Sequence, residues 1–418
     1  MPPPTTTTDS GQLADWPGLI HELAAMERPS ASDGELRAAQ SIADRLRALG
    51  CRVAIEEEQA HGSYWWPVGL VNGLVATAGA LTLRGRGRAR GGGRQAHWIA
   101  RALTAALAGT GAAALWDDLG HGERWFRRAL LPHRSTWNVV AEAGDPDAER
   151  TVVLIGHHDA AHSGLIFHPL LPRIPLKLAP RWHAGAGRSF PLLYTVWLGP
   201  VMVCAGSLLG VRRLVAAGTA LAAGATIAMT DIGLRDTVPG ANDNLSAVGV
   251  LVAIAAKLRE RPLPGVRVLL VSTGSEESFS EGMQGFGRRH FGELDPARTE
   301  MICLECVGGP TLIVIEGEGM LRMRDYPPAM RDALEHAATR AGIPIVRGLR
   351  TTAATDAIIA LRAGYRVATL ASVDETKLPM NYHWPTDTAD ALHWTTIEQA
   401  IAVCDEFLRT RTASDAQA

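Results

Sequence analysis

The stretch Val266–His290, VRVLLVSTGSEESFSEGMQGFGRRH, indicates the fold class of this 418-residue chain. It opens on an apolar run, passes through a turn with two adjacent carboxylates, and closes on a helical pattern. Such a run predicts a buried strand followed by a helix. The alternation recurs over 231–410, and strands that alternate with helices predict an α/β fold with an open, mostly parallel sheet covered on both faces. Further strands are expected at 301–306, 311–317, 343–348 and 366–372.

The α/β pattern starts further upstream and is interrupted twice by hydrophobic sequence. Residues 32–50 have the apolar spacing of an amphipathic helix, and 51–58 and 135–144 alternate as strands do. Each interruption, 64–116 and 190–230, contains two apolar stretches of about the length that crosses a bilayer as a helix. We therefore expect two inserted hydrophobic helical hairpins.

The apolar stretches differ in how well they suit a membrane. The stretches 64–83 and 190–211 are uncharged and carry Trp or Tyr near an end, as membrane-interface anchors do. Arg101 interrupts 97–116, and 214–229 is short and rich in Ala and Gly. The pattern favours a lipid bilayer as a partner, with buried helices of a lid or dimerisation domain as the alternative.

Composition shifts set the expected domain boundaries. The Pro- and Thr-rich start is typical of a disordered tail and lacks the charged and apolar regions of a secretory signal. Arginines in the turns of both hairpins favour cytoplasmic turns and an external α/β domain, in an integral protein of the cytoplasmic membrane. The expected parts are a tail 1–31, an α/β domain in three pieces, 32–63, 117–189 and 231–410, hairpins 64–116 and 190–230, and a tail 411–418.

Charge and cysteine content exclude two classes of protein. Lys and Arg total 41 and Asp and Glu total 43, so no overall basic field exists to hold nucleic acid. The five cysteines are scattered and odd in number, which argues against a disulfide framework. Cys303 and Cys306 lie in an apolar run without a second pair, so we interpret them as buried strand residues. The sequence does not indicate an oligomeric state.

Two segments offer the first candidate metal ligands. In TVVLIGHHDAAHSG (151–164), an apolar strand leads to His157 and Asp159, whose spacing lets the carboxylate orient the imidazole. His158 and His162 compete less well because neither has an Asp at that spacing. In PGANDNLSAVGV (239–250), Asp243 precedes an apolar helix. Helix capping is the common use of such an Asp, but its two oxygens can also bridge two cations.

Three further segments complete the set. The adjacent Glu276 and Glu277 follow a buried strand, where they repel each other unless protonated, solvated or neutralised by a cation. Glu305 ends another apolar strand, and burial of an unpaired carboxylate would be costly. His383 is followed by Asp387, which offers a ligand and a carboxylate to support it.

The ordered set of segments resembles the motifs of the bacterial zinc aminopeptidase family, whose relatives include glutamate carboxypeptidase, transferrin receptor and glutaminyl cyclase. The resemblance implies a three-layer αβα sandwich with a mixed, mostly parallel sheet, and a peptide or aminoacyl substrate. It implies two co-catalytic zinc ions, Glu276 as general base and Asp159 as support for His157. The implied ligands are His157 and Glu305 for one zinc, Glu277 and His383 for the other, and Asp243 as the bridge.

This chain departs from the family pattern in three places, and other activities stay open. Relatives often have Asp where Glu305 stands, a shorter turn after Glu277, and His where Ala357 follows Asp356. A single-zinc glutaminyl cyclase and an inactive membrane receptor or scaffold are alternatives. A carboxypeptidase would need a positive site for the substrate carboxylate, for which Arg347 and Arg350 are candidates.

Overall fold

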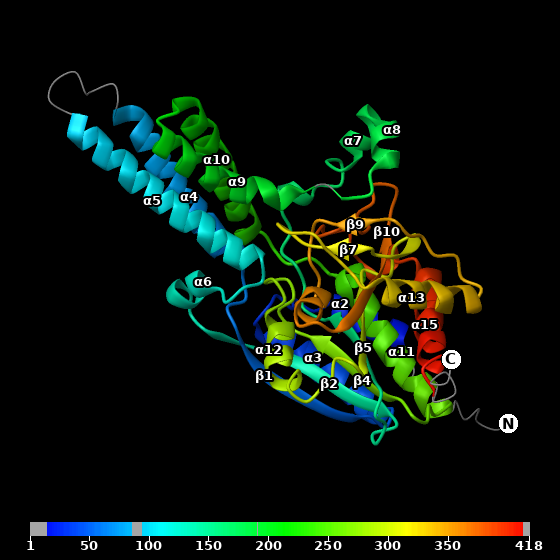
Figure 1. Ribbon diagram of the computed structural model, residues 1–418. Helices are drawn as coiled ribbons and strands as arrows, with labels where there is room; N and C mark the ends of the chain where they lie inside the picture. The colour runs from blue at the N-terminus through cyan, green and yellow to red at the C-terminus, as the bar shows by residue number, and fades with distance from the viewer. Residues whose placement is uncertain (1–14, 86–93, 190, 413–418) are drawn as a thin grey trace, which may run out of the picture.

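The computed structural model describes residues 15–85, 94–189 and 191–412, and these form a seven-stranded sheet beneath a helical bundle (Figure 1). The tails predicted at 1–14 and 413–418 and the arginine-rich turn at 86–93 lie outside the described residues. The strand order is β1-β2-β4-β3-β5-β10-β6. The strands are β1 (Arg52–Ala60), β2 (Arg134–Gly144), β3 (Thr151–His157), β4 (Arg267–Thr273), β5 (Thr299–Glu305), β6 (Thr311–Val314) and β10 (Arg366–Val373).

The centre of the sheet is parallel and its edges are antiparallel. β3 pairs in parallel with β4 and β5, and β5 pairs in parallel with β10, whereas β1, β2 and β6 run antiparallel to their neighbours. Every residue of β3 is buried, as expected of a strand covered on both faces. The predicted mixed, mostly parallel sheet is therefore confirmed.

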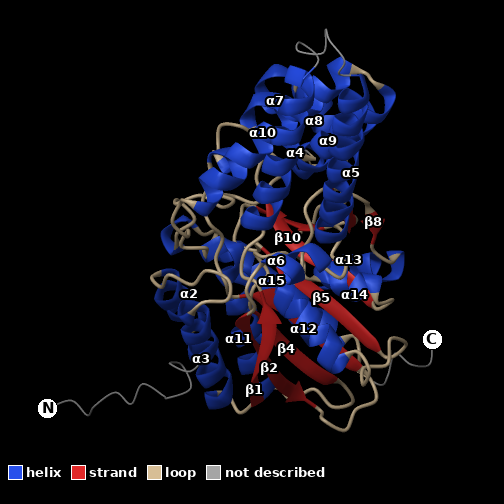
Figure 2. Ribbon diagram, turned by 90° about the vertical axis from the view of Figure 1, so that its left-hand side faces the viewer, coloured by secondary structure: helices blue, strands red, loops and turns tan. Residues whose placement is uncertain are grey.

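Helices cover both faces of the sheet, which makes the three layers. One face carries helices that contact one another around α11, and the other carries two helices that contact β1, β2, β5 and β10. Figure 2 shows α2 and α3 to one side of the sheet and the bundle above it. The first group is α2 (Trp16–Ala24), α3 (Asp33–Ala48), α11 (Ser246–Glu260), α13 (Pro328–Arg340) and α15 (Trp394–Arg409), and the second is α12 (Glu281–His290) and α14 (Ala357–Arg362).

Two sequence predictions are corrected. The tail predicted over 1–31 is wrong from residue 15 onward, because α2 buries Leu19, Ile20 and Leu23 in the main core. Its mixed, Pro-containing sequence concealed a short helix that only tertiary packing stabilises. The strand predicted at 343–348 is also absent, since this segment makes only an isolated bridge before the small sheet β8-β7-β9. That sheet joins β7 (Gly317–Glu318), β8 (Arg324–Asp325) and β9 (Arg350–Thr351).

The two hydrophobic insertions each form a pair of helices, as the sequence predicted, and the two pairs pack together into one bundle of four helices. Its members are α4 (Trp65–Gly85), α5 (Arg94–Leu119), α9 (Leu192–Leu209) and α10 (Arg212–Gly233), with the short α6 (Trp125–Leu130) after α5. α4, α5 and α10 are long and apolar enough to cross a membrane, and α9 is a shorter apolar helix. At 1.5 Å per residue α9 spans roughly 27 Å, close to the hydrocarbon thickness of a bilayer. A further apolar stretch, Ala241–Glu260, is 94% buried in the α/β domain and so belongs to its core.

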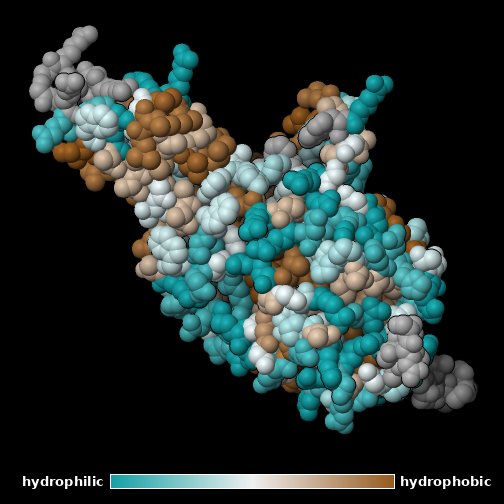
Figure 3. Space-filling view, viewed as in Figure 1, coloured by the Kyte–Doolittle hydropathy of each residue, from teal (hydrophilic) through white to brown (hydrophobic). Residues whose placement is uncertain are grey.

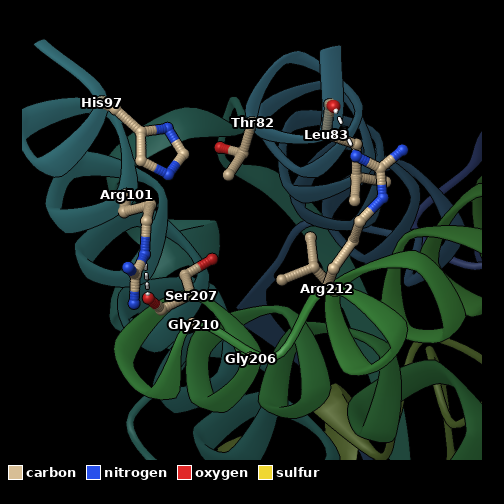
Figure 4. Close-up of a pocket in the computed structure, with 9 residues that line it drawn as sticks. Thr82, Leu83, His97, Arg101, Gly206, Ser207, Gly210 and Arg212 are labelled. Carbon is tan, nitrogen blue, oxygen red and sulfur yellow. Dashed lines mark hydrogen bonds between the residues drawn. The ribbon is translucent and has the colours of Figure 1, made fainter. Parts of the chain in front are cut away.

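Arg101, which interrupts the second apolar stretch, has a structural role at the distal tip of the bundle. Its guanidinium donates a hydrogen bond to the carbonyl of Ser207 at 2.8 Å (Figure 4) and another to the carbonyl of Leu208 at 3.0 Å. These carbonyls belong to the last turn of α9, where the helix itself offers no donor. The arginine therefore caps a neighbouring helix.

The outer surface of the bundle is apolar (Figure 3). Its exposed side chains include Leu103 at 66%, Leu81 at 61% and Ile227 at 70%. By contrast, Val346 is the single large apolar side chain that is exposed among the described residues from 235 onward. An apolar surface of this kind is typical of a region that contacts a membrane or another protein.

Candidate metal centre

The predicted ligands come together at the carboxyl edge of the sheet. His157 is the last residue of β3 and Glu305 the last residue of β5, while Glu277 follows the end of β4. Asp243 lies in the short helical turn η2 (Ala241–Leu245), which leads into α11, and His383 lies in the loop after β10. Parallel strands bring their carboxyl ends to one edge, so segments far apart in sequence meet there.

Asp243 stands between the two histidines. Its Oδ1 lies 3.2 Å from His157 Nε2, and its Oδ2 lies 3.3 Å from His383 Nε2. Glu277 Oε2 lies 3.2 Å from His383 Nε2, and Glu305 Oε1 lies 3.9 Å from His157 Nε2. The five side chains thus divide into two groups that share one carboxylate. Donors that each lie about 2.0–2.2 Å from a common zinc ion have separations of this order.

Four of the five candidate ligands are buried, and several of their polar atoms lack a hydrogen-bond partner. Among the described residues, His157 Nε2, Asp243 Oδ2 and Glu277 Oε1 are buried without a hydrogen bond. Burial raises the pKa of Glu305 to about 8, since a buried carboxylate near Asp243 is costly to ionise. Burial lowers the pKa of His383, but Glu277 and Asp243 outweigh it and raise the value to about 10. A cluster of buried acids and imidazoles with unsatisfied donor atoms fits divalent cations.

Asp159 positions both the first histidine and the paired glutamates. Its Oδ1 lies 3.3 Å from His157 Nδ1. The same carboxylate accepts the backbone N–H of Glu276 at 3.0 Å and of Glu277 at 3.1 Å, and the Ser30 hydroxyl at 2.6 Å. The carboxylate therefore lies beside His157, where the sequence analysis expects it to support the imidazole, and it also fixes the turn after β4, which the sequence did not indicate.

Asp387 holds the backbone around Asp243. Among the described residues it forms no hydrogen bond or ion pair with His383. Its carboxylate accepts the backbone N–H of Asn242 at 2.8 Å and of Asp243 at 3.1 Å. Asn244 plays the matching role on the other side, because its Oδ1 accepts the N–H of Cys306 and its Nδ2 donates to the carbonyl of Leu304. The η2 turn is thus held in place by the carboxyl end of β5 on one side and by the loop after β10 on the other.

Arg28 is a positioning residue that the sequence analysis missed, because it lies in the segment predicted to be a tail. Its side chain is fully buried and donates to the carbonyls of His158, Pro239 and Gly240 at 2.7–2.8 Å, and to Leu23 at 3.1 Å. It therefore ties the loop after His157 to the turn before Asp243. No local pattern distinguishes such an arginine from a surface one.

The other polar side chains near the site have separate partners. His158 Nδ1 pairs with the Ser272 hydroxyl at 2.9 Å, and burial lowers its pKa to about 3. His162 Nδ1 pairs with the carbonyl of Arg235 at 2.7 Å. Cys303 and Cys306 are buried free thiols, and the Cys306 thiol lies 3.3 Å from Glu305 Oε1. The two competing histidines are therefore outside the ligand cluster.

Two arginines that follow helix α5 hold the segment after Glu277 in place. Arg127 is fully buried, donates to the Ser278 carbonyl at 2.8 Å, and pairs with Asp118 at 2.7 Å. Arg124 also donates to the Ser278 and Phe279 carbonyls. Phe279 has a φ of 71°, a left-handed conformation that a bulky residue rarely adopts, so outside contacts must hold it. The longer turn thus connects the insertion to the site.

A cavity of about 590 Å³ lies over the candidate ligands. Its polar lining includes the candidate site residues Asp243, Glu276, Glu277, Glu305 and His383, and also the charged side chains Arg173, Asp374 and Lys377. The rest of its wall comes from the domain-side end of the bundle, from the segment 165–189, from the region of the small sheet and from the loop after β10, residues 374–383. The apolar lining includes Tyr64, Phe167, Leu193, Met229, Phe279 and Met320.

Comparison with known proteins agrees with this geometry. Residues 228–408 match the sequence profile of peptidase family M28. The α/β domain therefore contains a segment that matches peptidase family M28, and it is called the M28 domain. This segment contains Asp243, Glu276, Glu277, Glu305 and His383, while His157 lies upstream of it. The resemblance found in the sequence is thereby confirmed at the level of the family, whose members are generally zinc peptidases. No curated protein matches the chain.

Solved structures of this fold include enzymes of two activities. A glutaminyl cyclase from Bacteroides thetaiotaomicron is 13% identical, with a TM-score of 0.54 over 97% of this chain and 98% of that one. A leucine aminopeptidase precursor from the same organism is 12% identical, with a TM-score of 0.53 over 97% and 98%. The zinc aminopeptidase BSAP from Bacillus subtilis is 13% identical, with a TM-score of 0.51 over 98% and 96%. The M28 domain shares their fold, and at these identities the likeness does not choose between the activities.

Proposed function

We propose that the chain is a membrane-associated dizinc aminopeptidase that hydrolyses the N-terminal peptide bond of peptides. The observation that carries this proposal is Asp243, whose two oxygens face His157 and His383 separately, so that the five donors form two sites that share a carboxylate. His157 and Glu305 would hold one ion, and Glu277 and His383 the other. When bound, such ions lower the pKa of a water molecule and polarise the scissile carbonyl.

Glu276 is the proposed general base. Its carboxylate lies 3.8 Å from His157 Nε2 and lines the cavity, and its backbone is fixed by Asp159. Burial raises its pKa well above the usual value, which suits a group that accepts a proton from water and passes it to the leaving amine. Asp159 contacts both the Glu276 backbone and His157, and so it fixes the distance between the proposed base and the proposed ligand.

The arginines considered for a carboxypeptidase have other partners. Arg347 pairs with Glu316 at 2.7 Å, and Arg350 pairs with Asp325 at 2.7 Å. Neither side chain lines the cavity. Arg173 and Lys377 do line it, but Arg173 pairs with Glu375 at 3.5 Å, and Lys377 donates to three backbone carbonyls of the segment 183–186. The acidic groups around the cavity favour a positively charged substrate group, and a free amino terminus supplies one. This supports aminopeptidase action over carboxypeptidase action.

Metal content and turnover test the proposal together. We expect about two zinc ions per chain and release of amino acids from aminoacyl amides. Glu276→Gln should retain both ions and lose turnover by roughly 10²-fold or more, the usual contribution of a general base. Glu293→Gln is the matched control, because Glu293 is exposed, lies between α12 and β5, and does not line the cavity.

The outcome also separates the alternatives. One ion together with cyclisation of glutaminyl peptides would identify a cyclase, and absence of both metal and turnover would identify a receptor or scaffold. Equal turnover in the parent protein and in Glu276→Gln would overturn the role given to Glu276.

A further inference from the structure

The segment 165–189 stands beside the bundle on the same side of the M28 domain (Figure 1). It contains a turn, η1 (Leu165–Phe167), and two short helices, α7 (Arg173–Leu178) and α8 (Pro180–Gly185). Lys377 anchors it, because the ammonium group donates to the carbonyls of His183, Ala184 and Ala186 at 2.7–3.0 Å. The segment is thus a fixed projection, and we call it the α7–α8 segment.

Its surface is unusually apolar for a part of a folded domain. Five large apolar side chains are exposed within 14 residues, with Leu178 at 81% and Leu170 at 58%. By comparison, Val346 is the single large apolar side chain that is exposed among the described residues from 235 onward. Figure 3 shows apolar surface on two projections on one side of the molecule, which are the bundle and the α7–α8 segment in the matching view of Figure 1. The five are Leu165, Leu170, Leu171, Ile174 and Leu178.

The charge of the α7–α8 segment has a single sign. It contains Arg173, Lys177, Arg181 and Arg188 and no Asp or Glu. Apolar side chains mixed with cations are typical of protein surfaces that lie in the headgroup region of anionic bilayers. The bundle beside it presents an apolar surface that suits the hydrocarbon region. The two surfaces therefore match the two neighbouring layers of one bilayer.

The α7–α8 segment also forms a wall of the cavity. The Phe167 ring lies edge-on to the His383 ring, with centroids 4.5 Å apart. Phe167, Leu171 and Ile174 line the cavity, and Leu193 and Met229 of the bundle line it as well. Leu170, Lys177, Leu178 and Arg181 do not. Some side chains of this short segment therefore line the cavity over the proposed metal centre, and others are exposed on the outer surface.

We propose that the α7–α8 segment rests on an anionic lipid surface and that the substrates are amphiphilic peptides whose amino termini lie at that surface. The substrate class rests on the proposed aminopeptidase function, whereas the lipid contact does not. A peptide with an apolar body and a charged amino terminus matches a cavity with an apolar wall and an acidic end.

Lipid contact is tested on the full chain in nanodiscs, with half-buried Cys51 and Cys204 replaced by alanine. An environment-sensitive fluorophore is attached at Leu178→Cys and, as control, at Asp147→Cys, which lies in the exposed loop before β3, at the strand end opposite His157. Quenching by spin-labelled lipid is compared in phosphatidylcholine with and without phosphatidylglycerol. We expect quenching at residue 178 only, strongest in the anionic discs. Lys177→Gln with Arg181→Gln should weaken the contact by about fivefold per charge removed.

Substrate use is tested with Leu170→Glu and Leu178→Glu combined, and with Val346→Glu as a matched control. In anionic discs, the double variant should hydrolyse an acyl-anchored peptide at least about tenfold more slowly and a soluble aminoacyl amide at the parent rate, since ionised side chains leave the lipid surface. The control should change neither rate.

The possible failures are distinguishable. Equal quenching at residues 178 and 147 overturns the lipid contact. Fluorescence of an apolar environment at residue 178 without quenching by spin-labelled lipid also overturns it, and would indicate a protein partner. Equal effects on the two substrates overturn the substrate class. No hydrolysis of either substrate by the parent protein refutes the aminopeptidase function and leaves the fluorescence result to decide the lipid contact.

Discussion

Replacing Arg127 by methionine should loosen the turn that carries Glu276 and Glu277. Arg127 is fully buried and joins the region after α5 to the Ser278 carbonyl and to Asp118. Methionine keeps much of the aliphatic volume but leaves the buried Asp118 carboxylate and the Ser278 carbonyl without this donor. Removal of one member of a buried ion pair costs about 3–5 kcal/mol.

The magnitude can be followed at the turn itself. Arg124 retains its contacts there, so we take the lower value, about 3 kcal/mol, for the local opening of the turn. Every 1.36 kcal/mol is a factor of ten, so hydrogen exchange in the turn should become roughly 10²-fold faster. The amides to follow are those of Ser280 and Glu281, which donate to the carbonyls of Glu276 and Ser275 at 2.7 and 2.9 Å.

Arg128 provides the matched control on the same short helix. Its side chain is 52% exposed and lies 3.4 Å from Glu123, which is itself 85% exposed. Such a surface pair contributes at most about 1 kcal/mol, so Arg128→Met should leave exchange at the turn unchanged. The assay is hydrogen–deuterium exchange with mass spectrometry on peptides that cover 274–282. Equal protection in the Arg127 and Arg128 variants would refute the reasoning.

Three further predictions follow from the same geometry. Asp387→Asn should weaken zinc binding by about 10- to 100-fold in a chelator competition, because the carboxylate fixes the backbone of Asp243, and unchanged affinity would contradict that role. Burial lowers the pKa of His158 to about 3, whereas the unfolded value is near 6.5, so the stability of the folded chain should fall as the pH drops below about 6.5. In His158→Asn, the difference in unfolding temperature between pH 7 and pH 5 should be smaller than in the parent protein. An alkaline carbonate wash should leave the chain in the membrane fraction, since Leu81, Leu103 and Ile227 face outward, and release of the chain would mean that the bundle covers another protein surface.

The sequence by itself determined the layered fold and the identity of the candidate ligands. Apolar runs such as β3 record burial on both faces, and a carboxylate or imidazole at the end of such a run, as at Glu305 and His157, has few structural reasons to be there. The four apolar stretches likewise predicted the four bundle helices, because length and hydropathy are local properties.

Only the tertiary structure decided how these parts are held. Arg28 and Arg127 look like ordinary surface arginines in the sequence, and their roles depend on carbonyls that lie more than 100 residues away in the chain. The α2 helix is too short to be stable without the core that it covers. The cavity wall of the α7–α8 segment also depends on contacts with the bundle and with the loop after β10. Long-range packing places such groups, and local sequence patterns do not record it.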